Sequence, residues 1–251
     1  MSRLLLALFF PALMVCQPAI AGTVLTGTIS DNGVVLKMKH YYQGDSFRME
    51  NRHAGAAQDD HWAVYRGKTQ DILLASPSKK SYLEIKQADL ERLSAILGSF
   101  AKKPAQPAAD SGPVTFKALP GVQTVGKWQC TRYNVLSAGK TIGTLCSVPY
   151  ATVGADPKDF HSLVLAGKSI QALSKLGQVR IPVNTDSLDK ALELGFPVEF
   201  VGLDGDKPRS TVTIDTVVQE KVSEKLFAAP TGFQRSDLTA LLTQALAKQK
   251  K

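Results

Sequence analysis

The chain has 251 residues, of which 44% are hydrophobic and 21% charged, and it carries a formal net charge of +8. This composition excludes a chain too polar to bury a core and is typical of a globular protein. The 30 Lys and Arg residues are scattered along the sequence, so the charge indicates a solvated basic surface rather than a dedicated site for nucleic acid or anionic lipid.

The first 21 residues have the layout of a secretory signal peptide. Arg3 precedes an apolar run over residues 4–15, and Ala19-Ile20-Ala21 supplies the small residues of a cleavage site. The run is shorter than the roughly 20 residues that a membrane span requires. We therefore expect cleavage after Ala21 and a periplasmic mature chain with no transmembrane segment. A rival interpretation makes Cys16 a lipidated cysteine, but the valine before it fits such a site poorly.

Residues 23–86 predict a series of β-strands. The segments 23–30 and 34–44 form an expected hairpin around Asp31-Asn32-Gly33, because Asn-Gly favours the twisted two-residue turn. Gly residues and the sequence "SPSKK" divide the rest of this region into four more strands, over residues 45–52, 61–67, 70–76 and 80–86.

A helix over residues 87–103 and a linker are expected next. The apolar stripe of the helix is Leu90, Leu93, Ile96, Leu97 and Phe100. Residues 102–113, "KKPAQPAADSGP", are rich in Pro and Ala and indicate a flexible linker within the domain.

Cys130 and Cys146 flank a predicted hairpin. Ser137-Ala138-Gly139 reads as a three-residue loop with Gly in the left-handed position, and paired residue numbers then sum to 276, as those of the two cysteines do. A two-residue loop would break this match. No second Cys or His pair stands at metal-ligand spacing, and there is no C-x-x-C. We expect a structural disulfide in an oxidising compartment.

Residues 156–177 predict a helix with Asp156 as N-cap, Pro157 in the first turn and Gly177 at the C-terminal end. Its apolar stripe is Phe160, Leu163, Val164, Ile170 and Leu173. Filling the core is the ordinary role of such a stripe. Covering an apolar ligand is the alternative, and these five residues are our candidate ligand-binding set.

The rest of the chain predicts a hairpin and a final helix. The hairpin, residues 196–222, is expected to turn at Asp204-Gly205-Asp206. In its second strand one buried face is predicted to carry Val212, Ile214, Thr216 and Val218. Residues 236–251 predict an amphipathic helix with an apolar stripe at Leu238, Leu241, Leu242, Ala245 and Leu246.

No motif for catalysis, cofactor binding or metal binding is present. The sequence has no G-x-S-x-G, no Gly-rich phosphate loop and no H-E-x-x-H, so we expect no catalytic residue and no cofactor. Two groups invite other interpretations: His53, Asp59, Asp60 and His61, and Lys37, Lys39, Arg48 and Arg52 beside aromatic residues. The first matches no standard metal spacing and is read as a solvated turn. The second resembles a nucleic-acid-binding sheet, but an exported protein is not expected to meet nucleic acid.

Four short motifs carry a family resemblance that spans about residues 24–235. In order along the chain they comprise Arg48 and Glu50; Lys79, Lys80 and Tyr82; Gly126, Cys130 and Tyr133; and Phe227, Pro230, Gly232 and Phe233. Together they resemble an exported bacterial family known as a domain of unknown function, although Gly126 stands one residue further from the cysteine than in that family's pattern. More remotely, the layout is similar to the LolA/LolB lipoprotein carriers.

The resemblance implies an α+β fold: a curved antiparallel β-sheet, an incomplete barrel, with helices packed on the concave face. We expect a single domain over residues 22–235, followed by the C-terminal helix. The favoured function is that of an exported, non-enzymatic binding or carrier protein for an apolar ligand, a lipid or a lipidated partner. The alternative is a structural or stress-related envelope protein without a small-molecule ligand. The oligomeric state is not predicted.

Overall fold

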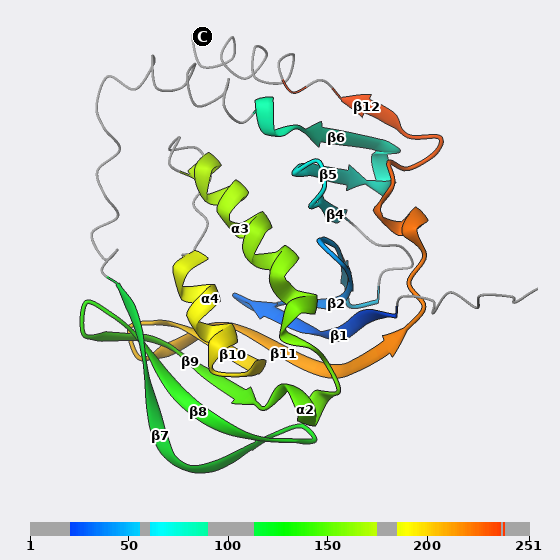
Figure 1. Cartoon of the computed structure of the whole chain (residues 1–251). Coiled ribbons are helices and arrows are strands. Elements are labelled where there is room, and N and C mark those ends of the chain that lie inside the picture. Colours follow the sequence, from blue (N-terminus) through cyan, green and yellow to red (C-terminus); the bar gives the residue numbers. More distant parts are fainter. Residues whose placement is uncertain (1–20, 56–60, 90–112, 175–184, 237, 239–251) are drawn as a thin grey trace, which may run out of the picture.

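The computed structural model describes residues 21–55, 61–89, 113–174, 185–236 and 238. Their strands form one twelve-stranded sheet in the order β12-β6-β5-β4-β3-β2-β1-β11-β10-β9-β8-β7. The sheet is curved and does not close on itself (Figure 1). Neighbouring strands are antiparallel except for β12, which runs parallel to β6. The prediction of a curved, unclosed and mostly antiparallel sheet is therefore confirmed.

The strands fall into two meanders that meet at β1 and β11. The first meander and the strand that extends it are β1 (Gly22–Asp31), β2 (Val34–Gln43), β3 (Ser46–His53), β4 (His61–Arg66), β5 (Asp71–Ser76), β6 (Ser81–Ile85) and β12 (Gln234–Ser236). The second meander is β7 (Val114–Val125), β8 (Trp128–Ser137), β9 (Lys140–Val148), β10 (Phe196–Asp204) and β11 (Lys207–Glu220). The pairing of β1 with β11, from Gly22–Glu220 to Asp31–Ser210, makes one sheet of the two.

Short helices complete the described part of the chain. They are the 3-10 helices η1 (Pro77–Lys79), η2 (Pro157–Phe160) and η3 (Glu224–Phe227) and the α-helices α2 (Tyr150–Val153), α3 (His161–Ser174) and α4 (Thr185–Glu193). Helix α3 contacts β3, and α4 contacts β10 and β7. The sequence analysis did not predict α2 or α4.

Several sequence expectations lie outside the described residues. They are the signal peptide up to residue 20, the helix stripe from Leu90 to Phe100, the linker up to residue 112, and Gly177. The C-terminal stripe beyond Leu238 and the side chains of Ile170 and Leu173 also lie outside them. These expectations stay predictions.

Two hairpin turns form where they were expected. Asn32 and Gly33 both have positive φ, 47° and 82°, as the twisted two-residue turn between β1 and β2 requires. Gly205, with φ of 61°, begins the two-residue turn between Asp204 and Lys207. These φ values confirm both turns. The turns could be predicted because the φ angles that they need depend only on the residues within each turn, the Asn-Gly and the Gly-Asp dipeptides.

The expected single buried face of β11 is wrong beyond Ile214. Thr26 pairs with Thr216 and Gly27 with Ile214, so a β-bulge leaves Asp215 without a direct partner. An extra residue reverses the side to which later side chains point. As a result Val217 packs against the core, whereas Val218 is 45% exposed.

The disulfide is confirmed, but the register from which it was predicted is wrong. Ala138 and Gly139, with φ of 49° and 79°, form a two-residue turn, and a bulge between Val135 and Leu136 shifts the pairing further. Arg132 therefore lies opposite Cys146. Cys130, two residues earlier on the same face, is the diagonal neighbour. The Cα atoms of Cys130 and Cys146 are 5.6 Å apart, within the range of a disulfide.

Two apolar clusters lie on opposite faces of the first meander, because consecutive strand residues alternate between faces. The inner core contains Leu25, Tyr65 and Ile72 together with residues of the second meander and of η2 and α3. The second cluster, which we call the strap core, is Val24, Trp62, Val64, Leu73, Ala75, Val222 and Phe227. We call residues 221–236, which cover this second face, the strap.

Helix α3 is fixed at its N-terminal end. Asp156 caps η2 in a reciprocal capping box with Asp159, as the sequence predicted for Asp156. The buried Thr23 donates a hydrogen bond from Oγ1 to Asp159 Oδ2 at 2.6 Å, and Gln219 Nε2 donates to Thr23 Oγ1 at 2.7 Å. Strands β1 and β11 thus hold the start of the helix, and Phe160 packs against Tyr42 and Phe196.

Candidate functional site

An apolar groove of about 420 Å³ lies over the outer strands of the first meander. Residues of β3, β4, β5, η1, β6 and β12 line it. Its floor is a row of directly paired side chains, one from each of five strands: Met49, Ala63, Leu74, Leu83 and Ser236. We call this row the groove row.

The groove lies on the same face as the inner core. Met49 pairs with His40, and His40 pairs with Leu25, which is part of the inner core. The adjacent row along the same face is Tyr42, Phe47, Tyr65, Ile72 and Ile85, and all of these residues are buried. Leu74, by contrast, is 43% exposed. One row of this face is therefore buried, and its neighbour is partly open at Leu74.

Two half-buried polar side chains lie at the inner end of the groove: Asn51, which lines it, and His40 beside Asn51. Burial lowers the pKa of His40 from 6.5 to about 4, and its contact with Asn51 offsets this only in part. Among the described residues His40 Nε2 and Asn51 Oδ1 are enclosed without a hydrogen-bond partner. An unsatisfied buried polar atom costs about 1–3 kcal/mol. Asn51 itself lines the groove.

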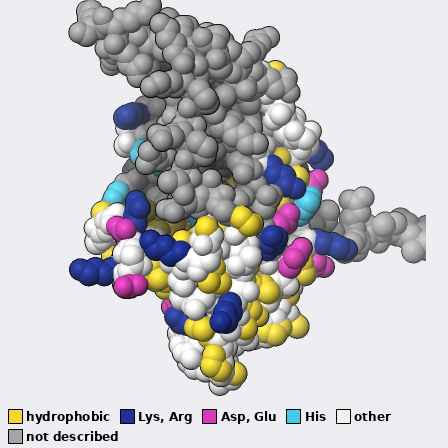
Figure 2. Space-filling view, turned by 90° about the vertical axis from the view of Figure 1, so that its left-hand side faces the viewer, with side chains coloured by type: hydrophobic (Ala, Val, Ile, Leu, Met, Phe, Trp, Pro, Cys, Tyr) yellow, Lys and Arg dark blue, Asp and Glu magenta, His cyan; other side chains and the backbone are white. Residues whose placement is uncertain are grey.

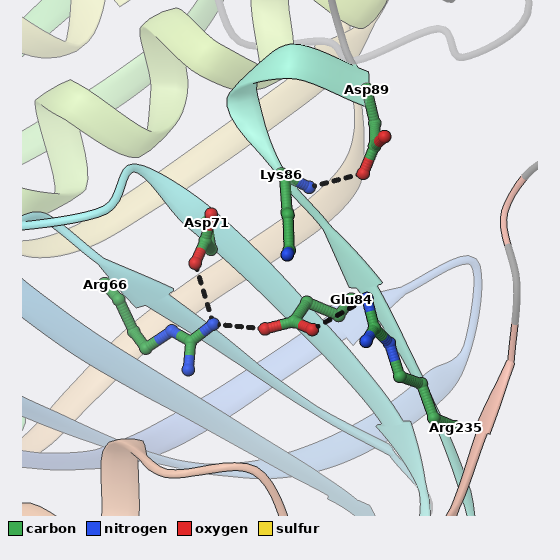
Figure 3. A network of polar contacts seen from close by, with 6 residues as sticks. All are labelled: Arg66, Asp71, Glu84, Lys86, Asp89 and Arg235. Carbon is green, nitrogen blue, oxygen red and sulfur yellow. Dashed lines mark hydrogen bonds and ion pairs between the residues drawn. The ribbon is translucent and has the colours of Figure 1, made fainter.

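A chain of ion pairs on the opposite face fixes β12, and with it Ser236 at the outer end of the groove row (Figure 3). Arg66 Nη2 lies 2.8 Å from Asp71 Oδ2 and 2.5 Å from Glu84 Oε1. Arg235 Nη2 of β12 lies 3.0 Å from the other oxygen of Glu84. The backbone N–H of Gln234 donates to the carbonyl of Lys80 at 2.8 Å. Four strands are thereby tied together at the edge of the sheet.

Several of the motif residues that carry the family resemblance belong to the strap or contact it. Arg48 donates to Glu50 at 2.6 Å and to the carbonyl of Leu226 at 3.0 Å, and its guanidinium lies 4.1 Å from the ring centroid of Trp62. Phe227 belongs to the strap core, and Tyr82 and Phe233 pack against it. These residues attach the C-terminal part of the chain to the sheet, which is a structural role.

The residues chosen from the α3 stripe are placed apart from the groove. Phe160 is buried in the inner core, the half-buried Leu163 packs against it, and Val164 is buried as well. The side chains of Ile170 and Leu173 are outside the described part. None of the described residues that line the groove is in the candidate ligand-binding set. Sequence reasoning missed the groove because its residues come from separate strands, and only their period-two placement could have indicated it.

The described part of the chain shows no metal site and no membrane-spanning helix. Within it there is no group of three or more His, Cys, Asp or Glu side chains that could hold a metal ion. Of the His/Asp group in the sequence, His53 ends β3 and His61 begins β4, while Asp59 and Asp60 are outside the described residues. None of the described helices is long and apolar enough to cross a bilayer.

The surface visible in Figure 2 carries its charges in a mixed pattern. Lys and Arg side chains are spread over this face among acidic and apolar ones and do not gather in one basic patch. On this face the positive net charge is therefore distributed, as the scattered Lys and Arg residues of the sequence indicate.

Comparison with known proteins gives only distant likenesses. No family model and no curated protein matches the chain, so the motif resemblance stays a prediction. An uncharacterised conserved protein from Thermus thermophilus is 11% identical, with a TM-score of 0.47 over 87% of this chain and 91% of that one. A crystal structure of MucB is 10% identical, with a TM-score of 0.41 over 86% of this chain and 60% of that one.

The complex of MucA and MucB from Pseudomonas aeruginosa gives a similar result. Its matched chain is 9% identical, with a TM-score of 0.42 over 88% of this chain and 59% of that one. This chain thus covers about 60% of the length of the matched chain in each of these two structures. All three TM-scores are below 0.5, and we draw no conclusion about function from them.

Proposed function

We propose that this protein is an exported, non-enzymatic binding protein whose outer groove takes an apolar ligand or the apolar part of a lipidated partner. The observation that carries the proposal is the groove row, in which Met49, Ala63, Leu74 and Leu83 form a continuous line of apolar side chains over four paired strands and Leu74 is partly exposed. Such a concave, apolar site with few polar groups is the usual form of a small-molecule pocket.

The helices support this proposal by their placement. In Figure 1 α3 and α4 lie over the side toward which the sheet curves, and we propose that they cover the concave face. Phe160 of η2 and Ala166 of α3 are part of the inner core, which holds this helix on the same face as the groove row. The Cys130–Cys146 disulfide supports export, because such bonds persist in oxidising compartments.

The test is binding of an apolar probe to the purified full chain. We expect N-phenyl-1-naphthylamine or a fluorescent fatty acid to bind with increased fluorescence. Leu74→Glu should weaken this binding at least tenfold, because a carboxylate in the groove must be desolvated when the probe enters.

Val218→Glu is the matched control, since Val218 is also a strand residue and is 45% exposed, against 43% for Leu74. It lies on β11, away from the groove, and should bind the probe like the wild type. If the wild type bound no probe, or if the two variants behaved alike, the groove would not be the binding site.

A further inference from the structure

We propose that the groove selects an amphiphile with a single apolar chain and one anionic head group, and that Lys79 binds the head. The inference rests on the proposed function, because it names the class of ligand that the same groove would take. Three features of the described residues carry it: the side chains that share the face of the groove, the placement of the charges, and the length of the apolar row.

A row of polar side chains runs beside the groove row on the same face of the sheet. It lies two residues further along each strand, and therefore about 7 Å away. We call it the polar row, and its members are Asn51, His61, Ser76, Ser81 and Gln234. All of them except Gln234 line the groove. The groove thus has one apolar side and one polar side, which suits an amphiphile better than a wholly apolar ligand.

The charges of these strands are separated by face. Successive residues of a strand point to opposite faces, so Glu50, Asp71 and Glu84 point to the strap face. There they form ion pairs with Arg48 and Arg66. The described residues that line the groove include no carboxylate, and only a lysine and a histidine among them can carry a positive charge. An anionic head would therefore meet no negative side chain on these walls.

Lys79 lies at the polar edge of the groove and is available to such a head. It is the last residue of η1, which joins β5 to β6 between Ser76 and Ser81 of the polar row. It lines the groove, is exposed, and takes part in none of the ion pairs within the described part of the chain. An ammonium on a flexible stem can reach a carboxylate or phosphate while that head stays in contact with water.

The length of the groove row fits one chain. From Leu83 of β6, beside η1, the row runs across three strand spacings to Met49 of β3, which is about 14 Å. This is close to half of the roughly 30 Å hydrocarbon core of a bilayer, the depth that one acyl chain fills in one leaflet. A head at Lys79 and a chain along the row toward Met49 would therefore occupy the groove together.

The experiment compares head groups on one chain length. Dodecanoate, dodecanol and dodecylamine each displace N-phenyl-1-naphthylamine from the full chain, and we expect dodecanoate to be the strongest competitor and dodecylamine the weakest. Lys79→Gln should weaken displacement by dodecanoate about fivefold, the upper range for an ion pair at an exposed position, and leave dodecanol unchanged. Lys80→Gln is the matched control, because Lys80 is the adjacent exposed lysine and is not among the described residues that line the groove.

The outcomes separate this inference from the proposed function. A preference for dodecanoate that is lost in Lys79→Gln and kept in Lys80→Gln would support the inference. Equal displacement by the three competitors, or equal losses in the two variants, would overturn it while the groove remained a binding site for apolar probes. If the wild type bound no probe and no competitor, the proposed function would fail, and the inference with it.

Discussion

The two faces of the first meander are made by the same alternating strands, and they differ in what covers them. On one face the strap covers Trp62, Val64 and Leu73 and is held by Arg48 and by the ion pairs of Glu84. On the other face the row from Tyr42 to Ile85 is buried in the inner core, which includes Phe160 of η2 and Ala166 of α3, whereas Leu74 is partly open. Because the same strands make both faces, the exposure of the open row depends on which segments pack on that face and not on the strands themselves.

The largest expected effect is on the free energy of unfolding, and it should differ between a buried core residue, Phe160, and Leu74 of the open row. Phe160 is buried between Tyr42 and Phe196, so Phe160→Ala should lower the free energy of unfolding by about 3–5 kcal/mol through the cavity it leaves. Leu74→Ala should cost less than about 1 kcal/mol, because its side chain is already partly in water. Urea denaturation of both variants gives the comparison. Similar losses would mean that Leu74 belongs to a filled core.

Acid should weaken the inner face through His40. Its pKa is about 4 in the folded chain, below the ordinary 6.5, so the imidazole stays neutral there while the unfolded chain takes up a proton. In this window the unfolded state binds more protons, and the free energy of unfolding should fall by up to about 3 kcal/mol from pH 6.5 to pH 4. Denaturation curves at several pH values measure the slope. His40→Gln should flatten it, and an unchanged slope would assign the acid sensitivity to other groups.

A smaller effect is expected on the strap face. Arg48→Met leaves Glu50 and the carbonyl of Leu226 without their cationic donor, which should cost about 2 kcal/mol. Limited proteolysis should then cut within the strap more readily. Arg132→Met is the control, because Arg132 pairs with Glu199 on the second meander, away from the strap. Equal proteolysis of the two variants would show that Arg48 does not hold the strap.

Local features of this fold could be predicted from the sequence, and features set by distant pairing could not. Asn32-Gly33 and Asp156 fix their turn and cap through neighbouring backbone atoms, and both were predicted. The bulge opposite Thr26 depends on the contact between β1 and β11, where a Cβ on Gly27 would lie 2.2 Å from the carbonyl oxygen of Thr213. No pattern within β11 alone contains that information.

The cysteine hairpin and the groove show the same limit. Two cysteines in a chain that is expected to be exported predict a disulfide whatever the register, so the bond was predicted correctly although the loop length was wrong. Helix α4, "TDSLDKALE", does carry apolar residues at helical spacing, Leu188, Ala191 and Leu192, but the stripe is short and was not recognised in the sequence. The groove row draws one residue from each of five strands, between positions 49 and 236, and its existence depends on pairings that no single segment specifies.

The seam between β1 and β11 has a consequence for the order of folding. Its partners, such as Gly22 and Glu220, come from nearly opposite ends of the described chain, so most of the chain must be available before the seam forms. Closing so long a loop costs entropy before any contact repays it, and non-local strand pairing is slow for this reason. Each meander can pair locally in the meantime, but its seam strand keeps an unpaired edge. We therefore expect two half-sheets with unpaired edges to precede the β1–β11 pairing, and we expect the chain to be most prone to aggregate at that stage.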